Sequence, residues 1–363
     1  MKPVRIIIAG GGTGGHLFPG IAIADEFSNR NKDNTVCFIG VGNRFERSVL
    51  SETKFSLECI TAQGIKGTGL KNQFLSVAKI PKGVCQSAKI LHKFKPDLVI
   101  GLGGYSSGPV ALAAGLMGVK TVIQEQNLFA GITNRILSLF AHRVYVSFPG
   151  TKNLLNSKKI LVTGNPVRKE ILQAKVSNAQ PGQRFTVVIL GGSQGAHSIN
   201  KAMINGLNYL QEKQRLFFIH QTGAADETIV KQAYEKAGIK CRVSSFFKDM
   251  GSLYTKADII ICRAGATTVA EITALGKPAI FIPFPFATDN HQVINAQILT
   301  NTGAAEMIIE DNLSGKILVE KIEKYAANPD ISRQMAAKSR EYGRPDAARC
   351  IVDDCYRLLG VNC

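Results

Sequence analysis

Residues 6–20 read IIIAGGGTGGHLFPG, a run of isoleucine that leads through a glycine-rich turn into a segment of helical character. Isoleucine favours strands, and glycine lets the backbone approach a bound group closely. A helix that begins directly after such a turn presents unpaired N–H groups and a partial positive charge, which suit a phosphate. The stretch therefore predicts the first strand, turn and helix of an α/β nucleotide-binding fold, with His16 beside the turn.

The same alternation of apolar runs and helical segments continues along the chain. Helices are predicted between the runs, for example over residues 196–210 and 268–275. Strand–helix alternation is typical of parallel sheets that are covered on both faces. The predicted strands are 4–9, 36–39, 98–100, 119–123, 144–146 and 160–162 in one sheet, and 186–190, 216–219, 259–261 and 279–282 in a second.

The length of 363 residues suits two domains. VVILGGSQGA at 187–196 repeats the pattern of IIIAGGGTGG, which indicates two Rossmann-like, doubly wound domains that face each other across a cleft. Pro166, in VTGNPVR, is a natural place to leave a domain. We therefore assign residues 1–165 to the first domain and 166–344 to the second, with the last helix, within 345–363, returning to the first.

Composition narrows the cellular setting. The net charge of +17 favours polyanionic partners such as phosphorylated substrates or an anionic membrane. The eight cysteines form no CxxC pair, so we interpret most of them as core residues of a protein in a reducing compartment. The first strand leaves no room for a signal peptide, which predicts a cytoplasmic location. Residues 98–119 are uncharged, but glycines and Pro109 interrupt them, which indicates a strand, turn and helix rather than a membrane span.

Three glycine-rich turns follow predicted strands, at 10–15, 101–109 and 191–196. Together they predict a cleft that binds a diphosphate compound. A dinucleotide-dependent oxidoreductase is the alternative, because Gly10, Gly12 and Gly15 satisfy GxGxxG. The next strand ends in Gly40-Val41-Gly42 without the acidic residue that binds the NAD ribose, so only an NADP site using Arg44 stays open. That alternative leaves the turn at 191–196 unexplained.

Two stretches of the second domain carry polar groups at predicted helix starts. CRAGATTVAE at 262–271 directs the N–H groups of Ala266, Thr267 and Thr268 toward a ligand. Glu271 lies about a turn further on and could accept hydrogen bonds from a ribose diol, or could be a solvated glutamate. PFPFATDNHQVINA at 283–296 offers groups that suit sugar hydroxyls, although any helix start could hold them: Asp289, His291, Gln292 and Asn295.

These motifs, in their order over nearly the whole chain, resemble the MurG family, the N-acetylglucosaminyltransferases of peptidoglycan synthesis, which are two-domain GT-B enzymes of family 28. The matching stretches are GGTGGHLFPG, GGYSSGP, EQN, GNPVR, GGSQGA, RAGATTVAE and DNHQ. The resemblance implies inverting transfer of GlcNAc from UDP-GlcNAc to undecaprenyl-diphospho-MurNAc-pentapeptide (lipid I), giving lipid II. It places the enzyme at the cytoplasmic face of the cell membrane as a peripheral protein. A UDP-sugar transferase that acts on another lipid, such as diacylglycerol, stays open.

The resemblance also assigns substrate-binding residues. Thr13, Gly14 and Gly15 would lie near the donor, Asn127 and Gln292 would contact the GlcNAc, and Arg168 and Ser193 would hold the diphosphate. Gln194 would be a further substrate-binding residue. The nucleotide would be surrounded by Ala266, Thr267, Thr268, Val269, Ala270 and Glu271, with Glu271 on the ribose and uracil near Phe247. The chain departs from the family at His291, where glutamine is common, and at Gln124, where histidine is common. The role of His291 is therefore left open.

The reaction requires a group to accept the proton of the acceptor hydroxyl and positive charge to stabilise the departing UDP. His16 is our first choice as general base because an imidazole titrates near neutral pH; it could instead cap the helix or contact a phosphate. Glu125 is the second choice, with a buried structural role as its alternative. Helix N-termini and Arg168 could stabilise UDP without a metal or cofactor, and the sequence contains no DxD metal-binding motif.

Residues 65–95 are rich in lysine, lack acidic residues and are interleaved with apolar side chains. Such a segment can lie on anionic lipid, where the polyprenyl tail of the acceptor would reside. It could also be an amphipathic helix whose lysines face solvent. We predict no nucleic-acid partner, because the chain has no nucleic-acid-binding motif and only 7% aromatic residues.

Overall fold

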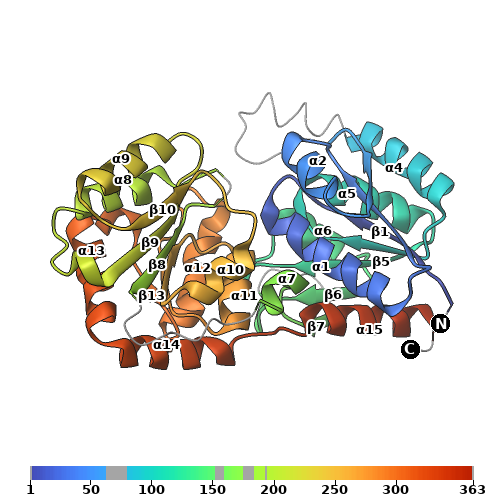
Figure 1. Ribbon diagram of the computed structural model, residues 1–363. Coiled ribbons are helices and arrows are strands. Elements are labelled where there is room, and N and C mark those ends of the chain that lie inside the picture. Colours follow the sequence, from blue (N-terminus) through green and yellow to red (C-terminus); the bar gives the residue numbers. More distant parts are fainter. Residues whose placement is uncertain (1, 63–79, 152–158, 175–183, 193, 362–363) are drawn as a thin grey trace. The chain divides into compact units, whose positions relative to one another are not determined.

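A computed structural model describes residues 2–62, 80–151, 159–174, 184–192 and 194–361. The chain divides into two compact units, Met1–Arg168 together with Arg344–Cys363, and Lys169–Gly343. Arg168 thus falls in the first unit, whereas the sequence placed it just inside the second. Each unit is an α/β fold around a parallel sheet (Figure 1).

In the described part of the first unit, seven strands form one parallel sheet in the order β3-β2-β1-β4-β5-β6-β7. Alternate residues of β1 point to opposite faces, and both faces are buried. Ile6 and Ile8 pack in the core that includes α1 and the last helix, whereas Ile7 and Ala9 pack in the core on the side of α4 and α5. The strands are β1 Arg5–Ala9, β2 Thr35–Gly40, β3 Ser56–Cys59, β4 Leu98–Gly101, β5 Lys120–Glu125, β6 Arg143–Val146 and β7 Ile160–Val162.

The described part of the second unit contains a six-stranded parallel sheet in the order β10-β9-β8-β11-β12-β13. Its strand β8 is apolar except for the buried Thr186 and is buried along nearly its full length. The predicted fold class, two doubly wound α/β units, is confirmed. The strands are β8 Phe185–Leu190, β9 Leu216–Gln221, β10 Cys241–Ser244, β11 Ile259–Cys262, β12 Ala279–Phe281 and β13 Glu306–Met307.

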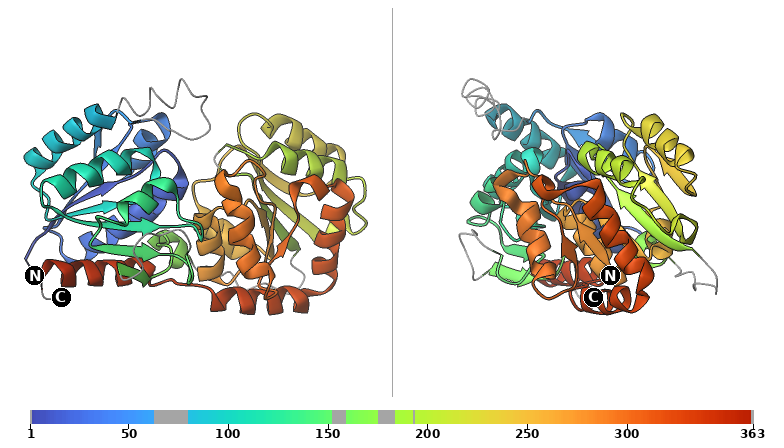
Figure 2. Two further views of the ribbon diagram at one scale, coloured as in Figure 1. Left: turned by 180° about the vertical axis from the view of Figure 1, so that it is seen from behind. Right: turned by 90° about the vertical axis from the view of Figure 1, so that its left-hand side faces the viewer.

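Helices cover both faces of each sheet (Figure 2). No helix in the described ranges is long and apolar enough to cross a membrane, and the uncharged residues 98–119 form β4 and α5. The first unit contains α1 Gly14–Arg30, α2 Arg44–Leu50, α4 Ile80–Phe94, α5 Gly104–Leu116, α6 Ile132–Leu137 and α15 Ala347–Leu359. The second contains α7 Lys169–Leu172, α8 His197–Gly206, α9 Glu227–Lys236, α10 Met250–Lys256, α11 Ala266–Leu275, α12 His291–Thr300, α13 Gly315–Ala327 and α14 Pro329–Glu341.

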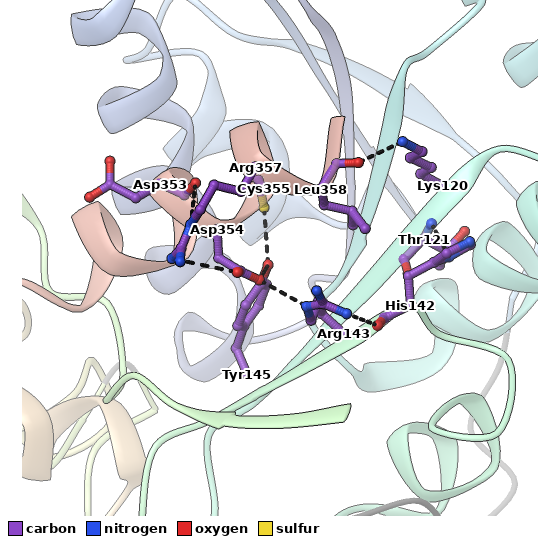
Figure 3. A network of polar contacts seen from close by, with 10 residues as sticks. All are labelled: Lys120, Thr121, His142, Arg143, Tyr145, Asp353, Asp354, Cys355, Arg357 and Leu358. Atoms are coloured by element: carbon purple, nitrogen blue, oxygen red, sulfur yellow. Dashed lines mark hydrogen bonds and ion pairs between the residues drawn. The ribbon is translucent and has the colours of Figure 1, made fainter. Parts of the chain in front are cut away.

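The last helix, α15, belongs to the first unit and packs against α1. Cys355 is fully buried in that core, and Asp354 accepts a 3.0 Å hydrogen bond from the hydroxyl of Tyr145 on β6. Arg143, on the same strand, forms a 3.3 Å ion pair with Asp354 (Figure 3). The chain therefore ends on the domain in which it begins.

Sheet order determines where a ligand can bind. In a doubly wound sheet, ligands bind beyond the carboxyl ends of the strands, at the point where the strand order reverses. That point lies between β1 and β4 in the first unit and between β8 and β11 in the second. The glycine-rich turns at 10–15, 101–104 and 191–196 and the stretch at 263–271 all follow these four strands.

Candidate active site

The first glycine-rich turn is occupied by a side chain of the protein itself. Glu46, on α2, is 1% exposed, and its Oε1 and Oε2 accept hydrogen bonds of 2.6 Å from the backbone N–H groups of Gly12 and Gly42, respectively. The amide of Gly12 is therefore not available to a phosphate, contrary to the prediction for this turn. The same carboxylate would repel the pyrophosphate of a dinucleotide, so the geometry also argues against the NADP alternative.

The second glycine-rich turn accommodates the ring of His16. A Cβ atom added at Gly103 would lie 3.2 Å from His16 Cε1, and one added at Gly104 would lie 3.4 Å from Cδ2. Both glycines have positive φ, +88° and +76°. The half-buried imidazole thus packs directly against the backbone of the turn at 101–104. The glycines of this turn make room for His16 rather than for a phosphate.

Glu125 is enclosed by donors at the end of β5. Its Oε1 accepts from the backbone N–H of Asn127 (2.9 Å) and from Asn127 Nδ2 (3.3 Å). Its Oε2 accepts from the N–H of Gly131 (3.1 Å) and from Asn134 Nδ2 (3.0 Å). Four donors use the lone-pair sites of this 2% exposed carboxylate, which leaves it little capacity to take a substrate proton. The structure favours the structural alternative for Glu125, which orients Asn127.

The other predicted residues of the first unit lie along the start of α1. Thr13 and Gly15 are exposed and Gly14 is half-buried. The guanidinium carbon of Arg168 lies 4.0 Å from the ring centroid of Phe18, one turn into the same helix. Thr13, Gly14, Gly15 and His16 thus lie at the start of α1, directly after β1, and Arg168 contacts this helix through Phe18, whereas Asn127 follows β5.

In the second unit, the turn after β8 is supported by Gln221 at the end of β9. Gln221 Nε2 donates to the carbonyl of Gly192 (3.0 Å), and Gln221 Oε1 accepts from the N–H of Phe247 (3.0 Å). The Phe247 side chain is 6% exposed. Uracil held by the backbone at this position could not bond to the N–H of Phe247, because Gln221 already accepts its hydrogen bond. Gln194 is exposed, and Ser193 lies outside the described residues.

Helix α11 begins directly after β11, with Gly265 as its N-cap. The side chains of Ala266, Thr267 and Val269 are buried, whereas Thr268 and Ala270 are half-buried. Glu271 is 4% exposed, and its Oε2 accepts a 2.7 Å hydrogen bond from the hydroxyl of Tyr254 on α10. It is therefore a buried, oriented carboxylate and not the solvated glutamate of the alternative interpretation.

Gln292 and His291 form the first turn of α12. Gln292 Oε1 accepts from the N–H groups of Ala264 (3.2 Å) and Phe284 (2.9 Å), so its amide nitrogen is the group that can face a sugar. The Nδ1 atom of His291 lies 2.7 Å from the carbonyl oxygen of Thr288, within the turn that precedes the helix. This contact gives His291 a role in local structure.

A buried polar cluster that the sequence did not reveal lies beneath the turn at 191–196. Asn200 donates to the carbonyl of Thr222 (2.9 Å) and to Asp226 Oδ2 (2.7 Å), and its Oδ1 lies 3.0 Å from His220 Nε2. Burial lowers the pKa of His220 to about 3, so the ring is neutral and its Nε2–H donates to Asn200. The cluster fixes the first turn of α8 to the end of β9.

The predicted membrane segment 65–95 lies partly outside the described residues, which resume at 80. Within α4, Ile90, Leu91 and Phe94 pack into the core and the lysines are exposed, so the apolar side chains of this part do not form a surface. Exposed apolar side chains occur instead on and after the neighbouring helices α5 and α6. We call this set the α5–α6 surface: Leu112, Leu116, Met117, Ile132, Ile136, Leu139 and Phe140.

Comparisons with known proteins identify the family of the chain. The model of the glycosyltransferase family 28 N-terminal domain matches residues 6–146, and that of the C-terminal domain matches residues 186–351. A protein of Syntrophus aciditrophicus named UDP-N-acetylglucosamine--N-acetylmuramyl-(pentapeptide) pyrophosphoryl-undecaprenol N-acetylglucosamine transferase is 46% identical, over 98% of this chain and 99% of its own. A protein of the same name from Geobacter metallireducens is 46% identical, over 97% and 98%.

A solved structure shows the same likeness. The crystal structure of Acinetobacter baumannii MurG superposes with a TM-score of 0.77 at 30% sequence identity, covering 97% of this chain and 98% of that one. The resemblance that the motifs indicated is thereby confirmed. Both family models, relatives that align over almost the full length and the two doubly wound sheets lead to one conclusion: the chain belongs to glycosyltransferase family 28.

Proposed function

We propose that this chain transfers GlcNAc from UDP-GlcNAc to undecaprenyl-diphospho-MurNAc-pentapeptide, giving lipid II for peptidoglycan synthesis. The observation that carries this proposal is the 46% identity, over almost the whole of both chains, to relatives named for this reaction. The polar groups at the carboxyl ends of the strands suit a UDP-sugar, and they give each unit a different part of the chemistry.

We assign the donor to the second unit. The Glu271 carboxylate, held by Tyr254, would accept hydrogen bonds from the ribose hydroxyls. The N-terminus of α11 and the turn at 191–196 would direct backbone N–H groups at the diphosphate. Gln292 would donate its amide N–H to the GlcNAc, because its oxygen is engaged by the backbone.

We assign the acceptor and the proton transfer to the first unit. A ring nitrogen of His16 would take the proton of the acceptor hydroxyl as its oxygen bonds to the anomeric carbon. The bond between that carbon and the UDP oxygen breaks on the opposite face, and UDP leaves with the electron pair, so the configuration inverts. Gly103 and Gly104 would fix the plane of the imidazole, and Asn127, oriented by Glu125, would contact the sugar.

The assignment of His16 as the base has a direct test. His16→Ala should lower kcat by about 100-fold or more, as expected for loss of a general base, and leave the affinity for UDP-GlcNAc within about twofold. Calorimetric titration with the donor and initial rates measured at saturation separate the two quantities. Parallel losses of donor affinity and turnover would show that His16 binds the donor instead.

We further propose that the enzyme binds the membrane peripherally, at its cytoplasmic face, through the α5–α6 surface. Leu116 and Phe140 are 76% and 61% exposed, and exposed lysines of α4 lie on the helix that packs beside α5. Apolar side chains beside lysines suit an interface with anionic lipid. Flotation with phosphatidylglycerol vesicles should recover the chain, and the double variant Leu116→Ser with Phe140→Ser should float far less.

Ile229→Ser is the matched control for flotation, because Ile229 is 56% exposed but belongs to the second unit. Equal recovery with neutral phosphatidylcholine vesicles, or equal loss in the control, would contradict the membrane proposal. The reaction itself is tested by incubating radiolabelled UDP-GlcNAc with a lipid I analogue and, separately, with diacylglycerol. Label in the lipid I product alone supports the proposed function, and label in diacylglycerol alone refutes it.

A further inference from the structure

Glu46 is a buried carboxylate that the assigned chemistry does not use. It is 1% exposed and lies where the turn after β1 meets the turn after β2. Oε1 accepts from Gly12 and Oε2 from Gly42, each over 2.6 Å. Gly11 and Gly40 make room for it: a Cβ atom on Gly40 would lie 2.6 Å from Oε2, and one on Gly11 would collide with Oε1. Four glycines therefore surround one carboxylate.

We propose that Glu46 is a built-in anion that takes the place of a phosphate in the first glycine-rich turn. It would fix the turn that leads to His16, and it would close this unit to nucleotide phosphates. The inference rests on the proposed function, in which His16 belongs to the acceptor side and UDP to the second unit. Glu46 is a positioning residue in this scheme, because it would act through the backbone.

The position and charge of Glu46 support closure of the turn. In doubly wound folds that bind dinucleotides, the turn after the first strand holds the pyrophosphate and the end of the second strand holds the ribose. Glu46 bridges these two places with one negative charge. A phosphate would have to displace two charge-assisted hydrogen bonds and approach a like charge. The turn thus keeps its shape without a ligand.

The connection to His16 runs through the start of α1. Gly12 immediately precedes Thr13, the N-cap of α1, and His16 lies in the first turn of that helix. Asn43 reinforces the contact: its Nδ2 donates to the carbonyl of Gly12 (3.3 Å), and its Oδ1 accepts from the N–H of Glu46 (2.8 Å). A change at Glu46 therefore shifts the turn on which His16 depends.

Glu46→Ala tests the proposal, because it leaves a space lined by two N–H donors that a small carboxylate can enter. We expect kcat to fall by about 10- to 100-fold, the range for a small misplacement of a catalytic group, with the affinity for UDP unchanged. Added sodium formate should then raise both the melting temperature and kcat of the variant. Sodium chloride at equal concentration, and formate added to the wild type, should do neither.

Asp97→Ala is the matched control, since Asp97 Oδ2 also accepts a backbone N–H, that of Arg5 (2.8 Å), at the other end of β1. Formate should not restore its stability. Glu46→Gln is a second variant, for the case that Glu46→Ala does not fold. Its amide NH2 group faces one of the two backbone N–H groups and cannot accept the hydrogen bond, so kcat should still fall. Wild-type kcat and melting temperature in Glu46→Gln, or no response of Glu46→Ala to formate, would overturn the proposal.

The melting-temperature response to formate needs no substrate, so it tests Glu46 even if the wild type proves inactive toward lipid I. A wild type without transferase activity refutes the proposed function. Formate-dependent stabilisation confined to Glu46→Ala would, in that case, still support the role of Glu46 as an internal anion.

Discussion

Replacement of Tyr254 by phenylalanine tests whether the donor ribose binds at Glu271. The tyrosine hydroxyl donates to Glu271 Oε2 over 2.7 Å, and the two residues are 1% and 4% exposed. Tyr254 thus holds the carboxylate in one orientation before any ligand arrives. Tyr254→Phe removes this restraint but leaves the negative charge, the aromatic ring and the helix in place.

The expected loss of affinity follows from the cost of ordering one side chain. Immobilising a flexible side chain on binding costs about 0.5–1.5 kcal/mol, so the affinity for UDP should fall by about 2- to 12-fold. Loss of a hydrogen bond to a charged group should also lower the free energy of unfolding by about 1.5–3 kcal/mol. The first effect requires the ribose, whereas the second does not.

Calorimetric titration with UDP and with 2′,3′-dideoxy-UDP separates these effects. Tyr254→Phe should weaken binding of UDP and leave binding of the dideoxy nucleotide unchanged. Tyr325→Phe is the matched control, because Tyr325 is also 1% exposed, lies in the same unit and donates its hydroxyl to a carboxylate, Glu306. It should lose stability but no UDP affinity. Equal losses for both nucleotides in Tyr254→Phe would refute the placement of the ribose.

Three further substitutions address the remaining contacts. Gly103→Ala puts a side chain at φ +88° and ψ −172°, a conformation that is nearly exclusive to glycine, at a cost of about 1–3 kcal/mol. The added methyl group would also lie beside the His16 ring, so initial rates should fall; full activity would contradict the packing of the imidazole. Glu125→Gln leaves buried donors unsatisfied and should lower stability by about 1–3 kcal/mol in urea unfolding; lost activity with unchanged stability would make Glu125 the base instead. Burial opposes ionisation of Glu306, but hydrogen bonds from Lys321, Tyr325 and Lys324 lower its pKa to about 2 from an ordinary 4.5. Glu306→Gln should therefore cost about 1–3 kcal/mol at pH 7, after allowance for partial exposure, and the difference from wild type should close as pH falls from about 4.5 to about 2.

Most of the strands that the sequence predicted have both faces buried; the exception is β7, a partly exposed edge strand whose three residues are all apolar. β1, β8 and β11 are predominantly apolar because each lies inside its sheet with helices on either side. β3, β10 and β13 were missed, since each is short and partly exposed and Glu58 and Arg242 interrupt the apolar character of the first two. All three lie at sheet edges, where burial imposes little pattern.

The sequence also predicted which turns lie at the carboxyl edge of each sheet, because parallel strands place their carboxyl ends at one edge. It could not predict what fills those turns. Glu46 is separated from Gly12 by 34 positions, and its approach depends on how β2 pairs with β1. Likewise, nothing local distinguishes a glycine that admits a phosphate from Gly103, which makes room for an imidazole. Such contacts require the tertiary structure.

The glycine-rich turns after β1 and β8 are contacted by neighbouring side chains of opposite hydrogen-bonding character. In the first unit, Glu46 follows β2, the strand beside β1, and accepts a hydrogen bond from the N–H of Gly12 in the glycine-rich turn. In the second unit, Gln221 ends β9, the strand beside β8, and donates a hydrogen bond to the carbonyl of Gly192 in the turn. The Glu46 carboxylate occupies a backbone N–H that a bound anion would need. The Gln221 amide instead occupies a backbone carbonyl, which would repel a bound anion. We therefore expect the turn of the second unit to bind a diphosphate and the turn of the first unit to exclude it. The neighbouring side chain, and not the glycine pattern, decides which turn can bind the anion.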